Sequence, residues 1–391
     1  MNWVTLLFYG LHFILLGCAV AACGYYLAAS AAALVWLADA RRQRALPSFT
    51  PPVTILKPLR GAEAEAYETL ASFCQLDYPA YQLVFGVQDP HDAVIPIIER
   101  LRNDFPQRDI ALVVNEAAHG YNGKVSNLQN ALPIAKHDVL LIADSDIRVT
   151  SDYLRRVVAP LQDAQVGMVT CLYRGVGAKT FGDLLENLGL ASLFAPEVLM
   201  ARMLQGVKFA LGATIVMRRA TLESVDGFAA IADHLADDYE LGYRVATQLN
   251  QQVVLSECVV DHVANGASLH AMFKHQLRWM RAVRVSRPAG YTGLIATYGT
   301  VTASLMLCAN GLNPWAWRLC MLTMSLRLLV ALVASGLVLR DGVSLKWFWL
   351  LPLRDCLAFI VWLTGFFGHE IIWRDERLRL LRDGRLTREE N

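Results

Sequence analysis

Two aspartates separated by one residue, Asp144 and Asp146, follow a short apolar run in the stretch LLIADSDIRV (residues 141–150). In a regular strand, residues i and i+2 point the same way, and the carboxyl ends of strands in open α/β sheets lie where ligands bind. Carboxylate oxygens suit a hard divalent cation that keeps part of its shell for water and phosphates. The pair is therefore a candidate for holding Mg²⁺ or Mn²⁺ against a diphosphate, and the alternative is a solvated turn.

Two earlier strands also end in polar residues. Lys57 and Pro58 stand in KPLRG, and Asp89 and Asp92 stand in VQDPHD. In a parallel sheet these segments reach the same edge, so a base and ribose could lie between them.

Three further segments carry charge next to predicted helices. Lys124 precedes a helix in HGYNGKVSNLQN, where backbone N–H groups attract phosphate or form an ordinary cap. Asp237 and Asp238 open an amphipathic pattern, either as first-turn charges or with one of them as a general base. Arg278 and Trp279 lie in a basic amphipathic segment, residues 269–288, of the kind that lies on a membrane surface.

The elements that must position these residues follow a βαβ rhythm. Short Val/Ile/Leu-rich runs alternate with helical patterns and turn residues, which predicts a mostly parallel sheet with helices on its faces. The predicted strands include residues 53–59, 81–89, 110–116 and 138–146. The pattern is typical of a nucleotide-binding α/β fold.

Both ends of the chain are apolar. Residues 5–37 contain no Asp, Glu, Lys or Arg, which exceeds the roughly 20 residues needed to span a bilayer. Arg41, Arg42 and Arg44 follow, and the positive-inside rule places the next segment in the cytoplasm. Apolar stretches at residues 290–309, 315–338 and 346–372 predict two further spans and a third segment, in which an interfacial helix is followed by a span.

Net charge and cysteine spacing argue against two classes of protein, nucleic-acid-binding proteins and proteins with a structural zinc site. The net charge of +1 gives no reason to expect a nucleic-acid partner. The eight cysteines form no CxxC pair, which argues against a structural zinc site. The predicted organisation is a transmembrane helix (1–40), a cytoplasmic catalytic domain (41–268), an interfacial amphipathic helix (269–288), a transmembrane region (289–373) and a charged tail (374–391).

As a set, these motifs resemble the inverting glycosyltransferases of the family 2 and family 21 type. The segments LKPLRG, LDYPAYQLVFGVQDPHD, ADSDIRV and LADDYELG are most similar to the ceramide glucosyltransferase branch. The segments NGKVSNLQN, GATIVMRR and HQLRWMRAVRVSRPAGY are similar to its bacterial hopanoid-biosynthesis members. The resemblance implies a GT-A type (Rossmann-like) α/β domain with flanking transmembrane helices.

The resemblance also implies roles for single residues. Asp92, with Asp89 beside it, matches the aspartate on the uridine side. Asp144 matches the nucleotide and metal aspartate, and Asp146 completes the D-S-D motif. Asp238, preceded by Asp237, matches the catalytic base.

A further match is the (Q/R)xxRW motif, which lies near the diphosphate and the acceptor entry. Arg278 and Trp279 match its end, and its first position is His275 instead of Gln or Arg. Together with Lys57, Pro58 and Lys124, these residues complete the expected donor site.

The implied activity is transfer of a hexose, GlcNAc or glucose, from a UDP-sugar to a hydroxyl of a membrane lipid. A hopanoid polyol is the first expected acceptor, and ceramide is the alternative. The expected location is multi-pass in the bacterial inner membrane, with the catalytic domain cytoplasmic. Two competing hypotheses are a nucleotide-binding membrane regulator and a metal-dependent lipid phosphohydrolase.

Overall fold

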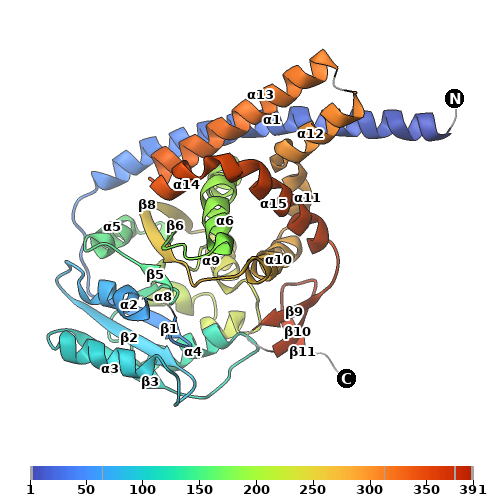
Figure 1. Cartoon of the computed structure of the whole chain (residues 1–391). Coiled ribbons are helices and arrows are strands. Elements are labelled where there is room, and N and C mark those ends of the chain that lie inside the picture. Colours follow the sequence, from blue (N-terminus) through green and yellow to red (C-terminus); the bar gives the residue numbers. More distant parts are fainter. Residues whose placement is uncertain (1–2, 64, 312, 374–375, 389–391) are drawn as a thin grey trace. The chain divides into compact units, whose positions relative to one another are not determined.

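The structure is a computed structural model that describes residues 3–63, 65–311, 313–373 and 376–388. It contains two compact units, each built from separate stretches of the chain (Figure 1). Unit 1 comprises residues 1–37, 180–204 and 267–368, and unit 2 comprises residues 38–179, 205–266 and 369–391. Residues 180–204 lie inside the range 41–268 expected for one catalytic domain, yet they group with the apolar helices of unit 1.

Unit 2 is built on an eight-stranded mixed sheet with the order β3-β2-β1-β4-β7-β6-β8-β5. Its strands are β1 (Val53–Leu59), β2 (Tyr81–Val87), β3 (Asp109–Val114), β4 (Val139–Ile142), β5 (Ile147–Arg148), β6 (Val166–Val176), β7 (Ile215–Arg218) and β8 (Gln252–Val263). The four strands predicted from sequence form the parallel half, whereas β7 runs antiparallel to β4 and β6. The predicted α/β class is confirmed.

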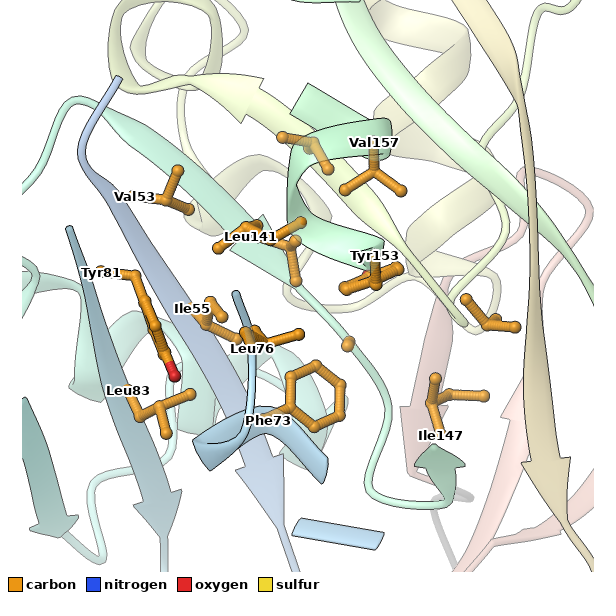
Figure 2. Packing of buried hydrophobic residues seen from close by; sticks show 14 of the residues in the cluster. Val53, Ile55, Phe73, Leu76, Tyr81, Leu83, Leu141, Ile147, Tyr153 and Val157 are labelled. Atoms are coloured by element: carbon orange, nitrogen blue, oxygen red, sulfur yellow. The ribbon is translucent and has the colours of Figure 1, made fainter. Parts of the chain in front are cut away.

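Alternate residues of β1 serve two different cores, as the period of two in a strand requires. Val53 and Ile55 face a cluster that includes residues of α2 (Ala66–Cys74), α3 (Ile95–Asp104) and α5 (Tyr153–Val158) (Figure 2). Leu56 belongs to a second cluster with residues of α4 (Gly123–Ala131), α8 (Arg219–Glu223) and α9 (Asp237–Gln248). Helices therefore cover both faces of the sheet, and burial of each such aliphatic side chain contributes roughly 1.5–3 kcal/mol.

The parallel strands bring their carboxyl ends to one edge of the sheet. Val53 is in register with Tyr81 of β2 and with Val139 of β4, so β1, β2 and β4 start level and run together. The loop after β2 carries Asp89 and Asp92, and the turn after β4 carries Asp144 and Asp146. This edge is where an open α/β sheet binds its ligand.

A small antiparallel sheet in unit 2 was not anticipated from the sequence. It consists of β9 (Glu370–Trp373), β10 (Glu376–Leu380) and β11 (Leu386–Arg388). The described part of the expected charged tail is therefore ordered as strands, and residues 374–375 and 389–391 lie outside the described residues. Leu386 N donates to Asp233 O at 2.7 Å, which links this sheet to the loop before α9.

Unit 1 is helical and apolar. Its helices are α1 (Trp3–Arg44, of which residues 38–44 belong to unit 2), α6 (Phe181–Gly189), α7 (Ala195–Gln205), α10 (Leu269–Ser286), α11 (Pro288–Gly293), α12 (Gly299–Ala309), α13 (Pro314–Leu332), α14 (Gly342–Lys346) and α15 (Leu351–Gly365). A π-helical turn, Leu190–Phe194, joins α6 to α7 into one helical stretch.

Four helical stretches of the described residues are long and apolar enough to cross a membrane. They are Tyr9–Arg44, Phe181–Gln205, Pro314–Val338 and Phe348–Gly365. A fifth candidate, Pro288–Ala309, is bent by 57° between its two halves. The sequence predicted all of these except Phe181–Gln205, whose charged and amide residues, among them Asp183 and Glu186, obscure its apolar character.

Small residues let the apolar helices of unit 1 approach closely. Ala19 of α1 packs against Ala303 of α12 and Ala316 of α13, and Tyr26 of α1 packs near Val330. Figure 1 shows α1 running beside α13. Such contacts are common between membrane helices, because lipid offers no hydrophobic driving force for association. The interior also holds an ion pair: both oxygens of Asp355 accept hydrogen bonds from Arg327, at 2.9 and 2.7 Å.

Candidate active site

Asp92 fixes the loop after β1 against the loop after β2. Its carboxylate accepts hydrogen bonds from Gly61 N at 2.9 and 2.8 Å and from Val94 N at 2.9 Å. The side chain is only 8% exposed, so these backbone donors are its main partners. Asp89 is exposed and accepts from His91 N at 2.8 Å. Asp92 therefore holds the two loops in position. The contact with uridine that is expected of Asp89 and Asp92 stays a prediction.

Asp144 lies beyond the end of its strand. Because β4 stops at Ile142, Asp144 and Asp146 stand in a turn, and the expectation that they share one side of a regular strand is wrong. Instead Asp144 Oδ1 lies 2.7 Å from Lys124 Nζ, whereas Asp146 Oδ2 lies 3.2 Å from His262 Nε2. The turn therefore gives the two carboxylates different partners.

Lys124 joins two acidic segments that are distant in the sequence. Its Nζ lies 2.7 Å from Asp144 Oδ1 and 3.1 Å from Asp237 Oδ2. Burial lowers the pKa of Lys124, but the carboxylates of Asp144, Asp237 and Asp238 outweigh burial and raise it above its ordinary value. The ammonium is therefore charged throughout the physiological range.

The first turn of α4 supports this arrangement. Asn122 caps the helix, since its side-chain oxygen accepts from Val125 N at 3.1 Å. Its Nδ2 donates to His234 O at 2.8 Å and to Asp237 Oδ1 at 3.3 Å. The same asparagine thus starts the helix that carries Lys124 and ties it to the start of α9.

Asp238 is held by the backbone of the turn before β7. Gly212 N donates to Asp238 Oδ2 at 2.8 Å, and Gly212 O accepts from Asp144 N at 3.3 Å. Burial, followed by repulsion from Asp237, raises the pKa of Asp238 to about 6. A half-buried carboxylate with this pKa is deprotonated at neutral pH and is a stronger base than an ordinary aspartate.

At Gly212 a side chain would crowd Asp144 and Lys124. A Cβ atom there would lie 2.5 Å from Asp144 Oδ2 and 3.2 Å from Lys124 Nζ. Sequence reading marked this segment as a small-residue turn but gave Gly212 no role. The lack of a side chain allows the carboxylates of Asp144 and Asp238 to approach the same short turn.

Lys57 is buried beneath the turn that carries the D-S-D motif. It is 1% exposed, its Nζ donates to Asp144 O at 2.8 Å, and it lies 3.8 Å from the centre of the Phe73 ring. Burial lowers the pKa of Lys57 to about 7, against the opposing effect of Asp146 and Asp144. The structure thus shows Lys57 and the half-buried Pro58 shaping the edge of the sheet, and their expected donor contacts stay predictions.

Asp146 offers the oxygen that best fits a cation. Its Oδ1 is buried and has no hydrogen-bond partner among the described residues. Burial opposes ionisation, but His262 and Lys57 lower the pKa of Asp146, so it is a carboxylate at neutral pH. No group of three His, Cys, Asp or Glu in the described chain could hold a metal. A cation would therefore need phosphate and water ligands as well, as Mg²⁺ commonly does.

The residues that match the (Q/R)xxRW motif lie on α10, which belongs to unit 1. His275 Nδ1 lies 2.7 Å from Glu186 Oε1 of α6, and the His275 and Trp279 rings are 4.4 Å apart between centroids. Arg278 is half-buried on the same helix. Sequence reading left the role of His275 open and missed Glu186, which nothing in its local pattern distinguishes.

The structure therefore assembles part of the expected site. Lys124, Asp144, Asp237 and Asp238 meet around Gly212, and Asp146 lies two residues from Asp144 with His262 as its partner. His262 was missed because it lies in β8, 116 residues along the chain from Asp146, and only sheet pairing brings the two strands together.

Comparison with known proteins identifies relatives along most of the chain. The model of glycosyl transferase family 21 matches residues 15–386. Ceramide glucosyltransferase 1 of Caenorhabditis elegans is 21% identical over 351 residues, which cover 87% of this chain and 74% of that protein. The beta-monoglucosyldiacylglycerol synthase of Trichormus variabilis is 26% identical over 209 residues, covering 52% of this chain and 43% of that protein.

Among solved structures, a mannosyltransferase from Pyrobaculum calidifontis in complex with GDP-Man and Mn²⁺ is 18% identical, with a TM-score of 0.49. The match covers 90% of this chain and 99% of that one. The family match extends over both units. The chain accordingly belongs to glycosyl transferase family 21 and is a sugar-transferring enzyme, and its mixed sheet agrees with the α/β class expected from the motifs.

Proposed function

We propose that this enzyme transfers a hexose, GlcNAc or glucose, from a UDP-sugar to a hydroxyl of a membrane lipid, with inversion at the anomeric carbon. The observation that carries the proposal is the position of Asp238. It is half-buried, has a pKa raised to about 6, and shares the Gly212 turn with Asp144 and its partner Lys124. A base and groups suited to a diphosphate thus occur at one edge of the sheet.

In the proposed reaction, Asp238 accepts the proton of the lipid hydroxyl while the hydroxyl oxygen attacks the anomeric carbon. The bond from that carbon to the diphosphate oxygen breaks, and UDP leaves with the electron pair. Lys124 neutralises the charge that develops on the diphosphate, and the motif resemblance assigns the same task to Arg278. Asp144 and Asp146 would hold Mg²⁺ or Mn²⁺, which supplies further electrostatic stabilisation of the leaving group.

The proposed acceptor is an uncharged lipid alcohol. The motif resemblance favours a hopanoid polyol, and the names of two relatives point to ceramide and to a diacylglycerol product. All three acceptors present a neutral hydroxyl on an apolar body. The apolar helices support a location in the membrane, and the arginines at the end of α1 support a cytoplasmic catalytic domain, in a bacterium at the inner membrane.

The test is turnover of UDP-hexoses by the purified full chain in vesicles that contain a mixed lipid extract. We expect mass spectrometry to find a neutral lipid that has gained one hexose or N-acetylhexosamine, together with stoichiometric UDP. Asp238→Asn should lower the rate by about 10²–10⁴-fold, the usual contribution of a general base. Glu240→Gln, on the same turn of α9 but paired with Arg244, is the matched control and should retain activity.

The competing hypotheses predict other outcomes. A nucleotide-binding regulator would bind UDP-sugar without forming a lipid product, and Asp238→Asn would change nothing measurable. A lipid phosphohydrolase would release phosphate from a headgroup without forming UDP. Either result would contradict the proposed transfer.

A further inference from the structure

The loop that leads into α9 is not fixed by an ordinary helix cap. Residues 232–236 form this loop, and Asp237 and Asp238 follow in the first turn of the helix. Ala236 stands at the N-cap position and makes no side-chain capping hydrogen bond. Alanine is a poor residue there, because it offers no oxygen to the free N–H groups of the first turn. The start of α9 therefore depends on contacts made by the loop itself.

One side of this loop is bonded to the segment before α4. Asn122 N donates to Ala232 O at 2.8 Å, and Tyr121 N donates to Asp233 Oδ1 at 2.9 Å. A Cβ atom at Gly120 would lie 2.6 Å from Ala232 O, so a side chain there would crowd the loop backbone. The segment that introduces α4 thus holds the first half of the loop.

The other side of the loop pairs with the end of the small C-terminal sheet. Leu386 N donates to Asp233 O at 2.7 Å, and Leu235 N donates to Gly384 O at 3.1 Å. Both segments belong to unit 2, although they are far apart in the sequence. The loop before the proposed base thereby gains two backbone hydrogen bonds from the last described part of the chain.

The sequence of the C-terminal segment favours strands with one covered face. Leu378, Leu380 and Leu386 are buried, whereas Arg377 and Arg379 are exposed. This alternation has the period of two that a strand imposes, and antiparallel sheets commonly cover one face only. The hairpin of β10 and β11, residues 376–388, is therefore an element with its own buried face.

A tight turn joins β10 to β11 and presents the groups that pair with the loop. Gly384 has a φ of +86°, which lies in the left-handed region that favours glycine. The Asp383 carboxylate accepts from Arg385 N at 3.1 Å and from Arg385 Nε at 2.7 Å. Leu381 N donates to Arg385 O at 2.8 Å. These bonds fix the turn that contains the Gly384 carbonyl.

We propose that the hairpin of residues 376–388 is a positioning element of the active site, which holds the loop before α9 and so places Asp238 for proton transfer. It acts through the backbone of residues 233–235. The inference rests on the proposed role of Asp238 and adds a requirement for a segment that lies outside the sequence motifs.

Displacement of the hairpin should leave the main sheet folded. The two core clusters that pack on the faces of the eight-stranded sheet include no described residue of the hairpin. A variant that releases the hairpin should therefore bind the donor and lose the reaction rate, because the proposed donor contacts lie in other loops.

The first experiment removes one hydrogen bond to the loop. Leu386→Pro deletes the N–H that donates to Asp233 O, whereas Leu386→Ala trims the same buried side chain and keeps that N–H. The full chain is assayed in lipid vesicles with UDP-sugar. We expect Leu386→Pro to lower kcat about 10²-fold, as a misplaced reacting group can, with KM for UDP-sugar close to that of the wild type. Leu386→Ala is the matched control and should keep most of kcat.

The second experiment restores the contact with a different bond. His234 and Arg385 face each other as an antiparallel β-bridge, flanked by the two hydrogen bonds between the loop and the hairpin. The Cα atoms of such a pair are about 4.5 Å apart, which suits a disulfide. In the Leu386→Pro background, His234→Cys with Arg385→Cys should form a disulfide on oxidation and recover kcat, and reduction should remove it again. Wild type given the same oxidant and reductant is the control.

Amide hydrogen exchange separates this inference from the proposed function, because it needs no turnover. Residues 233–241 should exchange faster in Leu386→Pro than in the wild type, and the disulfide should restore their protection. If the wild type transfers no sugar to lipid, the proposed function fails while the exchange rates still test the hairpin.

Four results would overturn the inference and leave lipid glycosylation intact. They are wild-type kcat in Leu386→Pro, equal kcat in Leu386→Pro and Leu386→Ala, unchanged exchange of residues 233–241, and a disulfide that forms without restoring kcat. Failure of the two cysteines to form a disulfide would show that the hairpin does not pair with the loop, and would overturn it as well.

Discussion

The backbone N–H of Gly212 lies 2.8 Å from Asp238 Oδ2, and the carbonyl of the same residue accepts from Asp144 N. One glycine therefore connects the carboxylate that we propose as the base to the turn that carries the proposed cation ligands. Any shift of this turn moves both groups, which makes the geometry of the site sensitive to small changes at Gly212.

Gly212→Ala should abolish most of the activity while the chain remains folded. The new methyl group would lie 2.5 Å from Asp144 Oδ2, so Asp144 and its partner Lys124 must move. A displacement of this kind can cost about 10²-fold in rate. The measurement is kcat with UDP-sugar in excess, and circular dichroism reports whether the fold persists.

Gly293→Ala is the control for this variant, because a Cβ atom there meets nothing within 4 Å. Its activity should match that of the wild type. Wild-type kcat in Gly212→Ala would show that the Gly212 turn is not part of the reacting geometry.

The pH dependence of the reaction should follow the ionisation of the Asp238 carboxyl group. Its pKa is raised to about 6 by burial and by Asp237, and only the carboxylate accepts a proton. Activity should therefore rise tenfold per pH unit well below pH 6 and level off above it. A pH profile of kcat under single-turnover conditions measures this limb.

The control for the pH profile is Asp237→Asn, which removes the neighbouring negative charge. Loss of this repulsion should move the acidic limb to lower pH, because less electrostatic work then opposes ionisation of Asp238. If the acidic limb of the pH profile does not move, its pKa belongs to a group other than Asp238.

Sugar transfer should require a divalent cation, and the affinity for that cation should depend on Asp146. Chelation by EDTA should stop transfer, and added Mn²⁺ or Mg²⁺ should restore it. Because Asp146 Oδ1 is buried without a hydrogen-bond partner among the described residues, Asp146→Asn should raise the half-saturating metal concentration by about tenfold or more.

Asp89→Asn is the matched control for the metal titration, since Asp89 is exposed and contacts His91 N. Its metal curve should coincide with that of the wild type. Full activity in EDTA would contradict a cation at this site, and so would identical metal titrations for wild type and Asp146→Asn.

His275 should act by positioning Trp279. His275 forms a hydrogen bond with Glu186 and its ring is tilted against the Trp279 ring, so His275→Leu should leave the Trp279 side chain less firmly held. We expect KM for the lipid to rise several-fold with little change in kcat. His275→Gln, which keeps a hydrogen-bonding group at the first position of the motif, should restore a near-wild-type KM. Equal defects in both variants would argue against the Glu186 contact as the cause.

Much of the fold could be predicted because its signals are local. The strand β1 was predicted with its observed bounds, Val53–Leu59, since a strand that is buried on both faces forms a short apolar run in the sequence. Asn122 and Gly123 mark the start of α4, because a cap residue must satisfy the first free N–H groups of the helix. The helices at both ends of the chain could be predicted because their segments are long, apolar and almost free of charge.

What the sequence determined by itself was which residues stand at the ends of strands and helices and which kind of chemistry they offer. Tertiary structure decided their partners. Lys124 reaches Asp237, Gly212 holds Asp238, Asp146 meets His262, and Lys57 is buried under the Asp144 turn. The reason is that local propensity fixes backbone conformation over a few residues, whereas these contacts form only when sheet pairing and core burial bring distant segments together.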